Sequence, residues 1–147
     1  RYRRCRVFWS CLTRRTRQLP AYSQFIHDPA AFPDRFEQLL KNGAQHRETQ
    51  EQNAERVIDF LPVVKLFTPD AGATWLLTEI DPEDHDRAFG LCDLGMGCPE
   101  LGYVSLSELA ALRGRLNLPV ERDLYFVPSK TISAYADEAR AAGCIRA

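Results

Sequence analysis

The sequence predicts an α+β protein, with a small, mainly antiparallel sheet of about five strands and N-terminal, middle and C-terminal helices packed against it. In the central third of the chain, short runs rich in β-branched and aromatic residues follow one another, separated by turn residues. The connections are too short for crossover helices, so neighbouring strands should be antiparallel. Segments with helical spacing lie mostly outside this region, which favours α+β over alternating α/β.

Three segments are predicted to be helical. Apolar residues recur at helical spacing in 32–42, where Pro33 suits the first turn and Gly43 is a natural stop. The polar run that follows, 44–56, fits an exposed helix or a loose connector.

The two later helices are marked by their capping residues. One begins at Ser105, which stands at capping-box spacing from Glu108, and should end near Gly114. The closing helix, 133–142, should end at Gly143, which tolerates a left-handed conformation.

The predicted strands are 63–68, 74–80, 87–94, 102–104 and 121–127. Residues 69–72, Pro-Asp-Ala-Gly, have the composition of a tight turn, so the first two strands should form a hairpin. A longer turn opens at residues 81–84.

Charge is distributed unevenly along the chain. The net charge is −1, but residues 1–17 contain seven arginines and no acidic residue, which leaves −8 for the remainder. We therefore predict an Arg-rich extension, residues 1–29, outside a single domain, residues 30–147. A basic arm attracts phosphate backbones. The candidate nucleic-acid residues are Arg3, Arg4, Arg6, Arg14, Arg15 and Arg17.

Cysteine usage and hydropathy bear on the compartment. The five cysteines are odd in number and include no CxxC pair, which is typical of reduced thiols. No run approaches the roughly 20 apolar residues that span a bilayer. We expect a cytoplasmic protein with no membrane partner.

Six sequence blocks occur in order: Pro62–Phe67, Ala73–Leu76, Phe89–Gly95, Pro99–Gly102, Leu106–Leu109 and Glu121–Leu124. Together they resemble the family called domain of unknown function 2958, over roughly residues 33–147. Members of that family are typically encoded on plasmids, integrative elements and other mobile DNA of bacteria. The resemblance implies an accessory role in transfer, maintenance or defence evasion, and it assigns no chemistry.

Acidic residues at the predicted strand ends are the sharpest candidate site. Strand alternation places Glu79 on one face with Trp75 and Leu77, and it could approach Asp93 at the end of the next strand. Two carboxylates in a partly apolar setting can hold a divalent cation or share a proton. The candidate acidic cluster comprises Glu79, Asp93, Glu100, Glu121 and Asp123. The alternative is that these acids are solvated or paired with arginine.

Other patterns are less informative. The glycine-rich stretch 90–102 lacks the spacing of a nucleotide-binding loop. Cys92, Cys98 and His85 match no common zinc motif, and His46 is interpreted as a surface histidine, like His27. We expect no cofactor.

The leading functional hypothesis is a non-enzymatic accessory protein of bacterial mobile DNA that binds a basic protein partner through its acidic surface. One alternative is a metal-assisted enzyme in which Glu79 and Asp93 hold the ion. Another is contact with nucleic acid through the Arg-rich arm.

Overall fold

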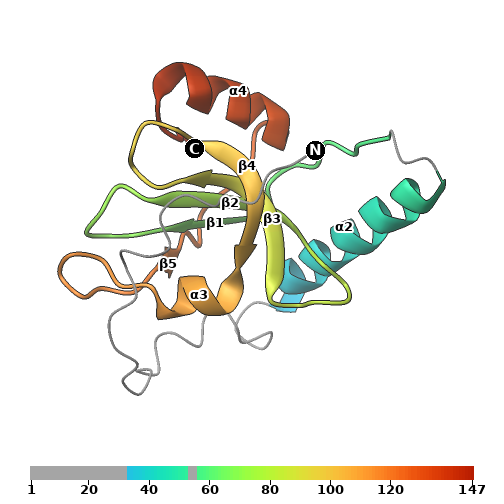
Figure 1. Ribbon diagram of the computed structural model, residues 1–147, viewed down its shortest axis with the longest axis horizontal. Helices are drawn as coiled ribbons and strands as arrows, with labels where there is room; N and C mark the ends of the chain where they lie inside the picture. The colour runs from blue at the N-terminus through green and yellow to red at the C-terminus, as the bar shows by residue number, and fades with distance from the viewer. Residues whose placement is uncertain (1–32, 53–55) are drawn as a thin grey trace.

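A five-stranded antiparallel sheet forms the centre of the protein, with helices on both of its faces (Figure 1). The structure is a computed structural model that describes residues 33–52 and 56–147. The predicted α+β class is confirmed.

Four strands of the sheet follow one another as a meander, and a fifth closes its far edge. They are β1 (Val64–Phe67), β2 (Thr74–Ile80), β3 (Arg87–Asp93), β4 (Glu100–Ser105) and β5 (Glu121–Arg122). Their spatial order is β4-β3-β2-β1-β5, and every neighbouring pair is antiparallel. The predicted hairpin between the first two strands is therefore confirmed.

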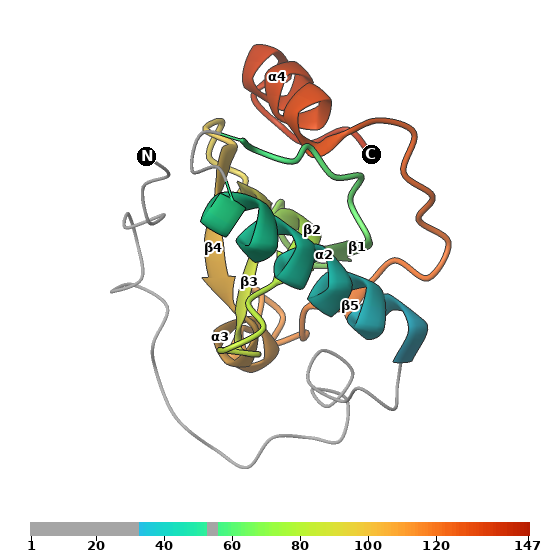
Figure 2. The same ribbon diagram turned by 90° about the vertical axis from the view of Figure 1, so that its right-hand side faces the viewer.

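The described helices are α2 (Pro33–Gln52), α3 (Leu106–Ala111) and α4 (Ile132–Ala142). Helices α2 and α3 pack on one face of the sheet and α4 packs on the other. Figure 1 shows α3 and α4 on opposite sides of the strands, and Figure 2 shows α2 crossing the sheet. None of these helices is long and apolar enough to cross a membrane.

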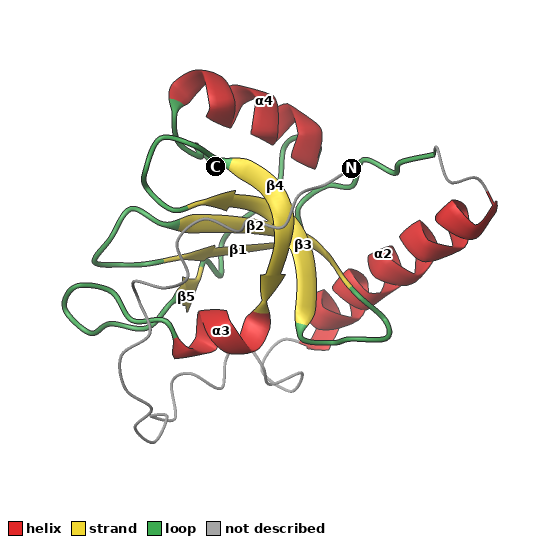
Figure 3. Cartoon of the chain, viewed as in Figure 1, coloured by secondary structure: helices red, strands yellow, loops and turns green. Residues whose placement is uncertain are grey.

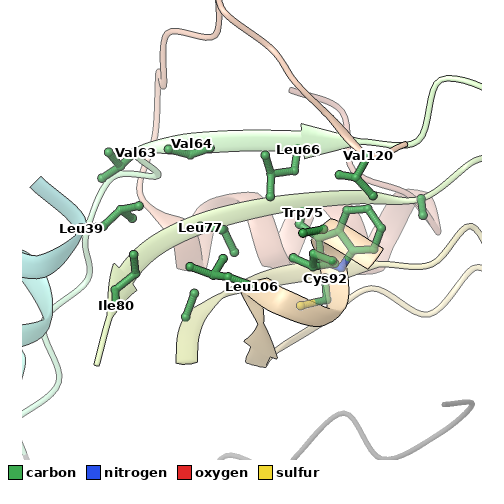
Figure 4. Close-up of a cluster of buried hydrophobic side chains, with 14 residues drawn as sticks. Leu39, Val63, Val64, Leu66, Trp75, Leu77, Ile80, Cys92, Leu106 and Val120 are labelled. Carbon is green, nitrogen blue, oxygen red and sulfur yellow. The ribbon is translucent and has the colours of Figure 1, made fainter. Parts of the chain in front are cut away.

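Strand β2 is buried on both faces and separates the two hydrophobic clusters. Trp75 and Leu77 point into the cluster beneath α2 and α3, whereas Leu76 points into the cluster beneath α4. Figure 4 shows the first cluster, with Leu39 of α2 and Ile80 towards one end and Trp75 towards the other. Both layers of the domain therefore depend on this strand.

Local capping explains where two of the helices begin or end. The Ser105 hydroxyl accepts a hydrogen bond from the Glu108 backbone N–H at 3.1 Å, as the capping-box spacing predicts. Gly143 ends α4 in the left-handed conformation, with φ of 73°. Helix α3 ends at Ala111, three residues before the predicted stop at Gly114.

The predicted helix stop at Gly43 is wrong. Helix α2 continues through it to Gln52, so the polar run that follows is mostly helical. A Cβ atom at Gly43 would lie 1.9 Å from the carbonyl oxygen of Ile80. The glycine is needed because the helix backbone touches the end of β2, and this long-range reason leaves no local signal.

The predicted strand 121–127 is also wrong beyond Arg122. The last ladder bond runs from the Asp123 N–H to the carbonyl of Lys65. Asp123 Oδ1 then accepts a hydrogen bond from the Tyr125 N–H at 3.0 Å. This side-chain bond turns the backbone away from the sheet.

Replacing Gly43 with alanine should destabilise the protein, although alanine is the better helix former by about 1 kcal/mol. The new methyl group would force α2 away from Ile80, and we expect a loss of about 1–3 kcal/mol in the free energy of unfolding, measured with urea. Gly72→Ala is the control, because a Cβ there would meet its nearest atom at 3.5 Å. A stabilised Gly43→Ala variant would contradict the close approach.

Candidate functional site

A polar cleft of about 290 Å³ opens between the second half of α2 and the end of β2. His46, Arg47 and Gln50 line it from the helix, and Glu79 lines it from β2. Its remaining walls come from the turn after β2, from the first residue of β3 and from β4. Those lining residues are Asp81, Pro82, Glu83, Arg87 and Tyr103.

A β-bulge at Thr78 orients the floor of the cleft. Leu77 pairs with Gly90 and Glu79 pairs with Phe89, so Thr78 is an extra residue in β2. The bulge shifts the alternation of the strand. As a result Ile80 enters the same cluster as Leu77, and Glu79 lines the cleft. The predicted common face for Glu79 and Leu77 is wrong for this reason.

One side of α2 is fixed against this bulge. The Asn42 side-chain amide donates a hydrogen bond to the Thr78 carbonyl at 2.7 Å. Gly43 lets the backbones approach, and one helical turn after Asn42 the ring of His46 reaches Glu79. One face of α2 therefore contacts three adjacent residues of β2, namely Thr78, Glu79 and Ile80.

His46 and Glu79 form a nearly buried pair at the floor of the cleft. Their side chains are 12% and 7% exposed, and His46 Nδ1 lies 2.8 and 3.0 Å from the two carboxylate oxygens of Glu79. An ionised carboxylate only accepts hydrogen bonds, so the ring proton belongs on Nδ1. The other ring nitrogen, Nε2, lies 2.9 Å from the side-chain nitrogen of Gln50.

The electrostatic setting acts on Glu79 in two directions. Burial raises the pKa of the Glu79 carboxyl, and the charge of Asp81 raises it further. The hydrogen bond and the charge of His46 lower it. The net result is a pKa above the ordinary value of 4.5. Such a pair can hold a proton inside the cleft, which makes it a candidate acid–base site.

Charged groups at the rim are largely compensated. Arg47 lies 2.7 Å from Glu83, and Arg87 lies 3.8 Å from Asp81. The Arg87 guanidinium also stacks over the Tyr103 ring, 4.0 Å from its centroid.

The proposed approach of Glu79 and Asp93 is wrong. Asp93 faces Thr74, at the opposite end of β2 from Glu79, and five residues of strand span about 17 Å. In two neighbouring antiparallel strands the carboxyl end of one strand lies beside the amino end of the other. Acids at the two carboxyl ends therefore cannot meet. The carboxylate pair of the metal-enzyme hypothesis is not formed.

Asp93 instead has a structural role. It is 2% exposed, and its two oxygens accept hydrogen bonds from the backbone N–H groups of Gly95 and Ile145, at 2.8 and 2.9 Å. It therefore joins the loop after β3 to the segment after α4.

The remaining predicted acids lie apart. Glu100 is exposed at the start of β4, on one edge of the sheet, and Glu121 is exposed on β5 at the other edge. Asp123, next to β5, pairs with Lys65 at 3.2 Å. The five acids thus form no single cluster, and Glu79 and Asp93 are too buried to belong to a surface.

The other candidates are also separate. Cys92 is buried, Cys98 is exposed, and within the described ranges no three His, Cys, Asp or Glu side chains gather to hold a metal ion. The candidate arginines of the arm, and His27, lie outside the described residues.

Exposed apolar side chains are a second notable feature, and they occur in the two loops that flank β5. Five large apolar residues in these loops are 40–91% exposed, and Figure 3 shows the backbone of the loops on either side of the strand. We call them the β5 strip: Leu116, Leu118, Leu124, Tyr125 and Val127. The exposure of Leu124, Tyr125 and Val127 was missed at the level of the sequence because residues 121–127 were assigned to a strand.

Glu79 should titrate above pH 4.5, the ordinary value for its carboxyl, in a side-chain ¹³C NMR titration of the folded protein. The folded state then holds this proton more tightly than the unfolded chain. The stability that Glu79 contributes is therefore complete below pH 4.5 and is lost as the pH rises through the raised pKa. Urea unfolding should show wild type losing stability relative to Glu79→Gln over this range. A midpoint at or below 4.5 would contradict the prediction.

Asp93→Ala should cost about 2–4 kcal/mol of unfolding free energy, because two backbone N–H groups lose their acceptor. The exposed Glu100→Ala is the control and should change stability by less than about 0.5 kcal/mol. If urea unfolding showed the same change in unfolding free energy for both substitutions, the structural role of Asp93 would be contradicted.

Comparison with known proteins identifies the family. A family model described as "Protein of unknown function (DUF2958)" matches residues 32–146. No curated protein and no solved structure matches the chain. Because the family model covers far more than half of the sequence, the chain belongs to the DUF2958 family.

Proposed function

We propose that this protein acts by binding another protein through the β5 strip, as an accessory protein of bacterial mobile DNA. The observation that carries the proposal is the exposure of Leu116, Leu124, Tyr125 and Val127, each between 68% and 91%. The role on mobile DNA is supported by the resemblance to the family alone.

The concentration of apolar side chains favours an interface over chance exposure. Single exposed hydrophobic residues are normal on a protein surface, whereas grouped ones mark interaction sites. Five of the nine exposed large hydrophobic residues in the described ranges fall in the twelve positions 116–127. Tyr125, the most exposed of them, is of a type enriched at binding hot spots.

Both halves of the strip are held in place by aspartates. Asp70 accepts a hydrogen bond from the Leu116 N–H at 2.5 Å, which ties the loop before β5 to the β1–β2 turn. Asp123 accepts one from the Tyr125 N–H and pairs with Lys65. A surface that is already ordered loses less conformational entropy when a partner binds.

Acidic residues have only a supporting role in this proposal. Glu121 is exposed between the two halves of the strip, and the chain after its Arg-rich start carries a net charge of −8. A partner with an apolar anchor site and a basic rim would be attracted by this charge and held by the strip.

Nucleic-acid contact through the Arg-rich arm is a second proposal, favoured by seven arginines without an acidic residue in residues 1–17. Deleting residues 1–19 should remove nucleic-acid binding and its salt dependence. Binding that survives the deletion would locate it in the remaining chain.

A photo-crosslinking amino acid at position 125 tests the protein-binding proposal in bacterial cells. We expect a defined crosslinked protein from position 125 and none from the control position 138, exposed on α4. With that protein purified, Leu124→Ser combined with Tyr125→Ser should raise the Kd at least about tenfold, or about 1.4 kcal/mol. The double substitution Glu100→Lys and Glu121→Lys should raise the Kd less than this. If it raised the Kd more, the acidic residues rather than the β5 strip would form the interface.

A further inference from the structure

The cleft beside α2 lies outside the β5 strip, and its floor presents a hydrogen-bond acceptor. Both carboxylate oxygens of Glu79 lie within 3.0 Å of His46 Nδ1, which places the ring proton on that nitrogen. When the imidazole is neutral, His46 Nε2 carries a lone pair and accepts a hydrogen bond. The cleft therefore has a fixed acceptor whose orientation is set by a buried carboxylate.

The acceptor is occupied by a carboxamide of the chain itself. Gln50 is exposed on α2, and its side-chain N–H donates to His46 Nε2 at 2.9 Å. Exposed side chains change rotamer at little cost on a fast timescale. Gln50 thus shows which chemical group the floor of the cleft accepts, and it can be displaced by a ligand that carries the same group.

Arg87 and Tyr103, which also line the cleft, offer hydrogen-bond donors and a flat surface. The Arg87 guanidinium lies over the Tyr103 ring at 4.0 Å, and its side chain is 49% exposed. A guanidinium donates to carbonyl oxygens and presents a planar face. A carboxamide supplies both partners, an N–H for His46 and a carbonyl for Arg87.

Size and charge narrow the ligand class. A volume of about 290 Å³ is at the small end of ligand sites, so the cleft has room for a small molecule only. With the His46 imidazole neutral, the lining carries two arginines, Arg47 and Arg87, against three acids, Glu79, Asp81 and Glu83. This excess of negative charge favours a neutral ligand over an anionic one.

We propose that this cleft binds a small planar molecule bearing a primary carboxamide, which donates its N–H to His46 Nε2 in place of Gln50. Nothing in the proposed protein-binding function requires this site, so the two stand or fall separately.

Benzamide and benzoate are matched probes, because they share a ring and differ in the donor. We expect benzamide to shift the His46 imidazole ¹⁵N signals of the full chain saturably, and benzoate to bind at least tenfold more weakly. Gln50→Ala removes the internal competitor and should tighten benzamide binding about two- to tenfold. Gln45→Ala, exposed on the same helix outside the cleft lining, is the control and should leave the affinity unchanged.

Glu79→Gln gives a further readout that packing alone would not produce. A glutamine at position 79 can accept from Nδ1–H through its oxygen or donate to Nδ1 through its nitrogen, so the ring proton is no longer held on Nδ1 alone. The preference for benzamide over benzoate should therefore fall. The proposal is overturned if benzamide gives no saturable shift in wild type or Gln50→Ala, if benzoate binds equally well, or if Gln50→Ala and Gln45→Ala have the same effect.

Discussion

The close contact between helix α2 and the end of strand β2 is the constraint on which the candidate cleft depends. Asn42, Gly43 and His46 meet Thr78, Ile80 and Glu79, so one helical face is matched to one bulged stretch of strand. Without a glycine the two backbones could not approach, and without the bulge Glu79 would not line the cleft. The first half of α2 supplies the core with Leu39, and the second half forms a wall of the cleft.

Most of the fold was predictable because it depends on local signals. Strand periodicity, short connections and capping residues such as Ser105 and Gly143 act within a few positions, and the structure confirms the elements they indicated. The failures occur where a distant segment determines the conformation. Gly43 resembles a helix stop until the carbonyl of Ile80 is placed beside it. Asp123 turns the chain out of the sheet although the residues after it have strand character.

The candidate site was less predictable, because it depends on register and on contacts between distant segments. The predicted approach of Glu79 to Asp93 rested on both acids lying at the ends of neighbouring strands, but antiparallel pairing places those two ends at opposite ends of the ladder. His46 was dismissed as a surface residue. Its position seven residues after the buried Leu39 places it on the same helical face, and that spacing was the available signal. Its partner on β2 could not be read from the sequence.

The pairing of β5 with β1 has a consequence for how the domain folds. The meander joins strands that are neighbours in sequence, whereas Leu66 of β1 pairs with Arg122 of β5, after β2, β3, β4 and α3 have intervened. Closing so long a loop costs more entropy than closing a hairpin, so this edge should form late. The β5 strip is then absent from partly folded chains. A protein that recognises the strip would engage only molecules that have completed folding.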